Sequence, residues 1–181
     1  MREGNQPLRD MNQLLQDSRE YLSARARLLS ALLLDDRRFD DSKIDPLVLI
    51  SEILVAMLYH GELARKHDQP DFDVKTPQGQ LIQVKYVLNE GETHPLKRKG
   101  SWNLYAVVLF RDHQVHMVTV FPNNDLTSIY QAFRRKNNRC TDPSRGFDLT
   151  QCRFTQMSEE KERFEQLGLT IWNKDDLGVR V

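Results

Sequence analysis

Two acids, an amide and an amine are predicted to meet on one face of a β-hairpin between residues 70 and 85, which reads PDFDVKTPQGQLIQVK. These residues are Asp71, Asp73, Gln83 and Lys85. Removing such polar and charged side chains from water to an otherwise apolar sheet costs free energy, so the set is expected to serve a purpose. The hairpin is therefore the first candidate for a functional site.

The geometry of the hairpin follows from its residue types. Pro77 sets the φ angle of the first turn position, and Gly79 can take the left-handed conformation that closes a three-residue loop between Thr76 and Gln80. Side chains alternate between faces along a strand. Cross-strand pairing then sets Asp73 opposite Gln83 and Asp71 opposite Lys85, all on one face, and leaves the other face apolar with Ile82, Val84, Tyr86 and Leu88.

This pattern resembles the PD-(D/E)XK nuclease superfamily, in the Mrr-like or archaeal-resolvase-like variant in which glutamine replaces the second acid. The motif would be Asp73 followed by Gln83, Val84 and Lys85, with the dipeptide ending at Asp71 as the literal PD. The resemblance implies a Mg²⁺ or Mn²⁺ ion held by Asp73, the side-chain oxygen of Gln83 and the backbone carbonyl of Val84, with Asp71 as a secondary ligand. It also implies that Lys85 positions the water that attacks a phosphodiester.

A predicted helix from residue 45 to about residue 66 carries a further candidate ligand, Glu52. Asp45 is a good N-cap and Pro46 suits the first helical position. The middle of this helix is apolar nearly all round, which predicts a buried helix. A carboxylate there needs a hydrogen-bonding neighbour or a metal. We favour the metal, because many members of the superfamily carry a glutamate on the helix before the motif hairpin.

Two basic segments are candidate DNA contacts. One is the tip of a predicted loop over residues 89–100, and the other is the end of a helix predicted from Asp125 to about residue 136. Phosphate contact is one interpretation of each. Simple solvation of the loop and stabilisation of the helix C-terminus are the alternatives. The residues are Lys97, Arg98, Lys99, Arg134, Arg135, Lys136 and Arg139.

The remaining elements predict an α/β fold. An amphipathic helix over residues 8–34 repeats Leu15, Leu22 and Leu29 at seven-residue spacing. Packing on its own domain is the preferred interpretation, and a dimerising helix that gives a homodimer is the alternative. Strands are predicted over 102–110, 114–121, 147–154 and 169–172, with a helix from Ser158 that Gly168 stops.

Together these elements predict a mixed central β-sheet flanked by helices, with a restriction-endonuclease-like core and an extra N-terminal helix. Residues 1–44 form a helical extension and residues 45–181 the nuclease-like domain, as one globular unit. The resemblance covers about residues 45–136.

Composition restricts the function further. The 181 residues include 26 basic and 26 acidic ones, so any DNA contact has to come from local patches. No apolar run is long enough to span a bilayer, the start of the chain is polar, and two cysteines are too few for a disulfide framework. These features predict a cytoplasmic protein without a membrane partner.

The sequence thus predicts a metal-dependent endonuclease that hydrolyses DNA phosphodiester bonds, in restriction, defence or repair. The alternative is a catalytically inactive protein of the nuclease fold that binds nucleic acid or a protein partner. A purely structural α/β domain is the third interpretation, and it leaves the polar face of the hairpin unexplained.

Overall fold

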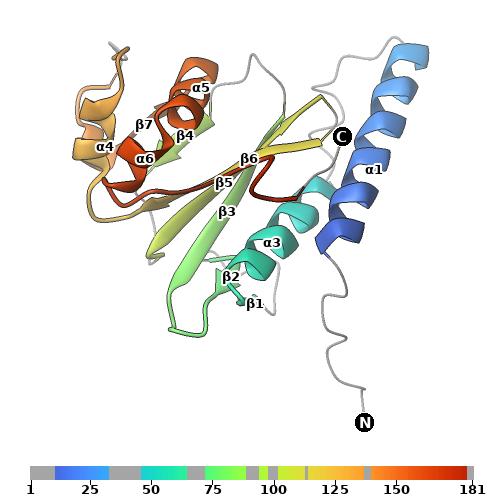
Figure 1. The fold of residues 1–181 in the computed structure, drawn as a ribbon, viewed down its shortest axis with the longest axis horizontal. Helices are drawn as coiled ribbons and strands as arrows, with labels where there is room; N and C mark the ends of the chain where they lie inside the picture. Colours follow the sequence, from blue (N-terminus) through green and yellow to red (C-terminus); the bar gives the residue numbers. More distant parts are fainter. Residues whose placement is uncertain are drawn as a thin grey trace.

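The described residues of the computed structural model form a mixed α/β fold around a six-stranded sheet (Figure 1). They are residues 11–32, 46–64, 72–88, 94–97, 102–112, 114–136 and 140–178. In spatial order the strands are β1 (Glu62–Leu63), β2 (Val74–Lys75), β3 (Leu81–Leu88), β5 (Leu104–Arg111), β6 (Gln114–Pro122) and β8 (Thr170–Asn173). β3 and β5 are parallel and the other neighbours are antiparallel, so the predicted mixed sheet flanked by helices is confirmed.

Helices α1 (Met11–Leu32) and α3 (Pro46–Leu58) cover one face of the sheet (Figure 1). Leu15 and Leu22 of α1 are buried with Leu54 of α3 in the core on this face. The leucine stripe therefore packs inside its own domain, as the preferred interpretation had it, and the side chain of Leu29 lies outside the described residues.

The middle of α3 is buried at Ser51, Leu54 and Val55, as predicted. The first turn is less enclosed, since Val48 is 39% exposed and Leu49 is 43% exposed. The helix also ends at Leu58 rather than near residue 66. Its end coincides with a left-handed residue, His60, whose φ angle is 50°, after which the chain enters β1.

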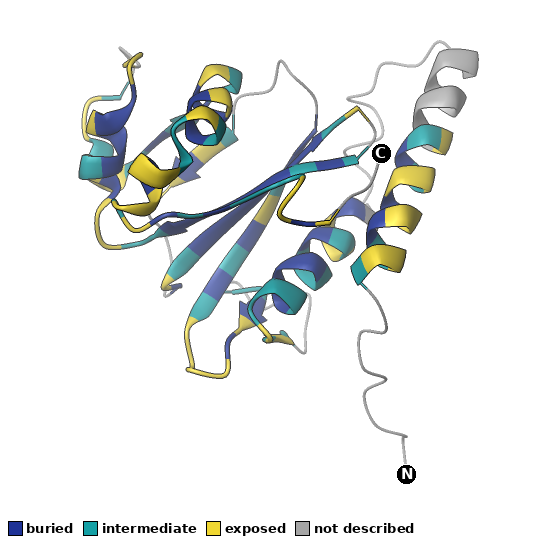
Figure 2. Cartoon of the chain, viewed as in Figure 1, coloured by how far each residue is buried: buried dark blue, intermediate teal, exposed yellow. Residues whose placement is uncertain are grey.

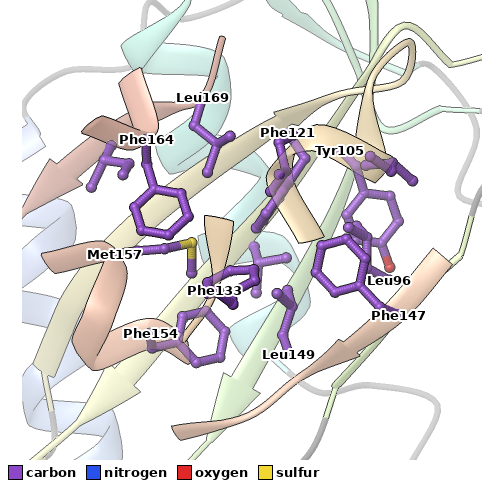
Figure 3. Close-up of a cluster of buried hydrophobic side chains, with 14 of the residues drawn as sticks. Leu96, Tyr105, Phe121, Phe133, Phe147, Leu149, Phe154, Met157, Phe164 and Leu169 are labelled. Atoms are coloured by element: carbon purple, nitrogen blue, oxygen red, sulfur yellow. The ribbon is translucent and has the colours of Figure 1, made fainter. Parts of the chain in front are cut away.

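The other face of the sheet carries α4 (Leu126–Ala132), α5 (Gln151–Glu159), α6 (Lys161–Glu165) and a separate two-stranded sheet (Figure 1). That small sheet pairs β4 (His94–Lys97) with β7 (Gly146–Leu149). Aromatic rings from these elements fill a second core (Figure 3). Neighbouring rings such as Phe133 and Phe164, with centroids 5.0 Å apart, fix how the helices sit on the sheet.

The predicted loop over residues 89–100 is wrong in its middle, because β4 forms there. β4 pairs with β7 from far along the chain, with His94 opposite Leu149 and Lys97 opposite Gly146. At Gly146 the φ angle is 133°, and a Cβ atom would lie 2.0 Å from the carbonyl oxygen of Leu96. This close backbone approach requires glycine.

Two further predictions in the C-terminal third need correction. The strand predicted over residues 147–154 ends at Leu149, and α5 begins at Gln151. The helix after Asp125 ends at Ala132 because Phe133 is extended, with a ψ angle of 136°, and buries its ring in the core. Of the two residues able to cap this helix, Asn124 and Asp125, the structure uses Asp125, whose side chain accepts from the backbone N–H of Ser128 at 3.0 Å.

Ser158, the predicted start of a helix, lies inside α5, and the next helix, α6, begins at Lys161. The chain then turns at Gly168 with a φ angle of 88°. The short strand predicted over residues 169–172 is β8, which forms the edge of the large sheet beside β6.

One buried cation organises the second core. The Arg153 side chain on α5 is 3% exposed. Its guanidinium lies 5.2 Å from the ring centroids of Tyr130 and Phe133 and 5.4 Å from that of Phe147. It also donates to the backbone carbonyls of Asp148 and Arg135. Burial lowers the pKa of this arginine, and the rings and carbonyls offset the cost of removing its charge from water.

Candidate functional site

The turn of the β2–β3 hairpin has the predicted geometry. The backbone N–H of Thr76 donates to Gln80 at 2.9 Å, and the N–H of Gly79 donates back to Thr76 at 2.9 Å. Gly79 has a φ angle of 82°, in the left-handed region. Val74 pairs with Ile82 and Lys75 with Leu81. Asp73 lies just outside this ladder, and its backbone N–H donates to Ile82, so the predicted backbone pairing of Asp73 with Gln83 stays a prediction.

Asp73 lies directly before β2, and both its backbone and its carboxylate are hydrogen-bonded. Its N–H donates to Ile82 at 2.9 Å and its carbonyl accepts from Ala64 at 2.8 Å. Its Oδ2 atom accepts the side-chain amide of Gln83 and, at 2.6 Å, the backbone N–H of Val84. The carboxylate thus accepts the Val84 N–H that a neighbouring strand would otherwise bind. Gln83 and Val84, two of the predicted ligands, both contact Asp73 in this way.

Gln83 and Lys85 share a face of β3, as predicted, and Ile82 and Val84 face the core beneath α3. Along β3 the more exposed residues alternate with buried ones at this point (Figure 2). Gln83 is half-buried and Lys85 is exposed, so this end of the polar face opens to solvent. Asp71 lies outside the described residues, so its predicted pairing with Lys85 stays a prediction.

Two residues that the sequence analysis missed adjoin this face. Tyr105 lies directly beside Gln83 in the parallel β3–β5 ladder. Its hydroxyl oxygen is 2.8 Å from Nε2 of His94 on β4. A tyrosine on an otherwise apolar central strand was the available signal, but placing it beside Gln83 requires the β3–β5 register. His94 had no signal, because it lies in a segment that reads as a polar loop.

The electrostatics connect these residues. Burial lowers the pKa of His94 to about 4, and the nearby positive charge of Lys85 adds to this effect. Burial also raises the pKa of Tyr105, and the negative charge of Asp73 raises it further. The imidazole and the phenol are therefore both neutral near pH 7.

The pKa of His94 predicts a pH dependence of stability. An unfolded histidine titrates near about 6.5, so between that pH and about 4 the unfolded chain binds a proton that the folded protein rejects. The free energy of unfolding should therefore fall as the pH drops through this window, by an order of 2 kcal/mol after discounting for partial exposure. Urea unfolding at several pH values checks this, with His94→Gln as the matched variant. Equal slopes for both proteins would contradict it.

Glu52 is half-buried on α3, which packs against β1, β2 and β3. It therefore lies on the opposite side of the sheet from Gln83 and Lys85. Asp73 lies directly before β2. A shared ion would require the Glu52 side chain to reach Asp73 from the other side of the sheet, so its role as a ligand stays a prediction.

Among the described residues, no group of three histidine, cysteine, aspartate or glutamate side chains is arranged to hold a metal ion. Asp73 and Glu52, the predicted carboxylate ligands that the structure describes, are not part of such a group, and the third, Asp71, lies outside the described residues. Both cysteines, Cys140 and Cys152, are free thiols.

The basic cluster after α4 is partly used inside the protein. The ammonium of Lys136 donates to the backbone carbonyls of Tyr130, at 3.0 Å, and of Gln131 and Phe133, so it stabilises the C-terminus of α4. Arg134 pairs with Glu160 and, at 3.8 Å, with Glu159. For Lys136 these contacts favour the helix-terminus interpretation over DNA contact.

Arg135 is exposed, and its guanidinium lies 3.8 Å from Sγ of Cys152. Lys97 is exposed on β4 and lines a hollow of about 270 Å³ together with Arg145. Phosphate contact by Arg135 and Lys97 therefore stays a prediction. Arg98, Lys99 and Arg139 lie outside the described residues.

Comparison of the sequence with models of known protein families finds no match, and comparison with curated proteins also finds none. In the part of the chain that the structure describes, no helix combines the length and apolarity that crossing a bilayer requires.

Proposed function

We propose that the protein is a metal-dependent endonuclease that hydrolyses DNA phosphodiester bonds. The observation that carries the proposal is the convergence of polar groups at Asp73, directly before β2. The Asp73 carboxylate, the Gln83 amide and the Val84 backbone meet there at hydrogen-bonding distance, with Lys85 on the same face as Gln83. A stable hairpin does not need this set, since an apolar pair at the same positions would avoid the cost of desolvating a carboxylate.

The donor types fit a hard divalent cation. Asp73 offers a carboxylate and Gln83 an amide oxygen, and in an extended strand the carbonyl of Val84 faces the same side as its N–H. Mg²⁺ and Mn²⁺ take oxygen ligands of these kinds. In the structure Gln83 turns its NH₂ group toward Asp73, and rotation of the amide by half a turn would present the oxygen instead. Glu52 would add a second negative charge.

The roles in hydrolysis follow from these positions. When bound, the ion supplies a Lewis acid that makes a nearby water more acidic and neutralises charge on the phosphate. Lys85 is exposed on the same face, and its ammonium would orient the attacking water and offset the charge that develops on the phosphoryl oxygens. Asp73 is held through its backbone and its carboxylate, so the centre is organised before substrate arrives.

Nicking of a supercoiled plasmid tests the proposal. Wild type should nick in Mg²⁺ or Mn²⁺ and stop when the metal is chelated, and Lys85→Ala should slow nicking by roughly 100-fold or more. Lys75→Ala is the matched control, because it removes an exposed lysine from the same hairpin and should cut at the wild-type rate. No cutting by wild type, or equal cutting by Lys85→Ala, would refute the proposal.

One observation favours a second candidate function. The Asp73 carboxylate is already satisfied by two N–H donors, as a purely structural carboxylate would be. A protein of this fold that binds nucleic acid or a protein partner without cutting would keep such a bond. Binding of duplex DNA by wild type without nicking, at an affinity that Lys85→Ala does not change, would favour this candidate.

A further inference from the structure

The pair formed by Tyr105 and His94 adjoins the polar face but has no part in the predicted motif. Tyr105 is 6% exposed and lies at one end of the second core (Figure 3). Its ring packs against that of Trp102, with the centroids 5.2 Å apart. The neighbouring inward positions are apolar: Val87, Leu96 and Val107. Phenylalanine would fill the same space without a hydroxyl that has to be hydrogen-bonded, so the hydroxyl calls for an explanation.

The surroundings of the hydroxyl are those of the proposed centre. Tyr105 adjoins Gln83, the Asp73 charge acts on its phenol, and the Lys85 charge acts on His94. Neighbouring strands lie about 5 Å apart. A phosphate in contact with Lys85 and Asp73 would therefore be within reach of Tyr105, which lies beside Gln83 on the next strand.

From this placement we propose that Tyr105 is a catalytic residue whose hydroxyl donates a hydrogen bond to a non-bridging oxygen of the scissile phosphodiester, and that His94 is the positioning residue that holds this hydroxyl. The inference rests on the proposed endonuclease function and adds two residues to its site. It requires the imidazole tautomer in which Nε2–H donates to the phenolic oxygen over the observed 2.8 Å. The phenolic proton is then left for the substrate.

The chemistry needs no proton transfer by either residue. Water attacks phosphorus, the bond from phosphorus to the leaving sugar oxygen breaks, and negative charge increases on the non-bridging oxygens during the step. A neutral donor held in place stabilises that charge without reorganising. A phenol ordinarily keeps its proton in the neutral range, so the hydroxyl is available as a donor.

Three variants test the proposal in the plasmid assay, with rates measured across substrate concentrations at saturating Mg²⁺. Tyr105→Phe removes only the hydroxyl and should lower kcat by roughly 100-fold, the effect of deleting one oxyanion donor, while KM changes less than about twofold. His94→Leu removes the group that holds the hydroxyl and should lower kcat by roughly 10-fold or more. His94→Gln keeps an N–H donor and should restore most of this loss.

The outcomes separate this inference from the proposed function. If wild type does not cut, both the proposed endonuclease function and this inference are refuted. If wild type cuts and Tyr105→Phe cuts equally well, or only its melting temperature changes, the inference falls and the endonuclease stands. His94→Gln no faster than His94→Leu would overturn the positioning role. Should Tyr105→Phe fail to fold, which circular dichroism would show, the two His94 variants decide: equal rates overturn the proposal, and rescue by glutamine supports it.

Discussion

Replacing Asp73 by asparagine is expected to abolish metal-dependent cleavage while the protein remains folded. In the structure both the Gln83 amide and the Val84 N–H reach the same carboxylate oxygen, Oδ2. The single oxygen of asparagine can accept both bonds, so the substitution removes the negative charge and leaves the geometry. Loss of a charged ligand should cost about 3–4 kcal/mol of transition-state stabilisation, or roughly 100- to 1000-fold in rate.

Asp73→Ala is the companion variant. It removes the charge and also leaves the Val84 N–H without its acceptor, which should add about 1–3 kcal/mol of destabilisation. Plasmid nicking gives the rates, and urea unfolding gives the stabilities. Asparagine matching wild type in rate would identify Asp73 as a purely structural residue, whereas inactivity of both variants with stability lost in alanine alone would identify it as the centre.

Replacing Arg153 by alanine should be among the most destabilising single changes in the described core. It would leave a cavity among the rings of Tyr130, Phe133 and Phe147 and deprive two backbone carbonyls of their donor. The expected loss is about 3–4 kcal/mol in the free energy of unfolding. The midpoint of urea unfolding measures this loss.

Arg153→Met separates volume from charge. Methionine refills much of the space without the cation, so it should lose about half as much as alanine. Arg145→Ala is the control, because this arginine is exposed and its removal should change stability by less than about 0.5 kcal/mol. A methionine variant as stable as wild type would mean that the cation contributes nothing beyond filling space.

Arg153 also bears on the site through the small sheet. Its guanidinium donates to the carbonyl of Asp148 on β7, and Asp148 lies opposite Pro95 on β4, next to His94. Loss of the cation should therefore loosen the strand that holds His94 against Tyr105. The packing around Arg153 thus helps to hold β4, and with it His94, beside Tyr105.

The sequence by itself determined the hairpin and the grouping of Asp73, Gln83, Val84 and Lys85 on it. The loop depends on the φ angles available to Pro77 and Gly79, and the alternation of side chains follows from extended backbone. Both depend on residues close together in the chain. The cap at Asp125 is local in the same sense, and it too could be predicted.

The ends of helices and strands are harder to predict from sequence, because the contacts that decide them come from residues far away in the chain. Nothing in the residues around His94 favours a strand over a loop, and β4 exists because β7 pairs with it. The helix after Asp125 has helix-forming residues up to Lys136, yet it ends where burial of the Phe133 ring in the aromatic core takes precedence over continued helix.

Only the tertiary structure decided which residues join the hairpin face. Tyr105 reaches Gln83 through the parallel β3–β5 ladder, and His94 reaches Tyr105 through a strand of a second sheet. The same packing puts Glu52 on the far side of the sheet from Lys85. Short-range rules fix turn type and side-chain alternation, whereas register between distant strands follows from burial of the whole core, which no local stretch of sequence encodes.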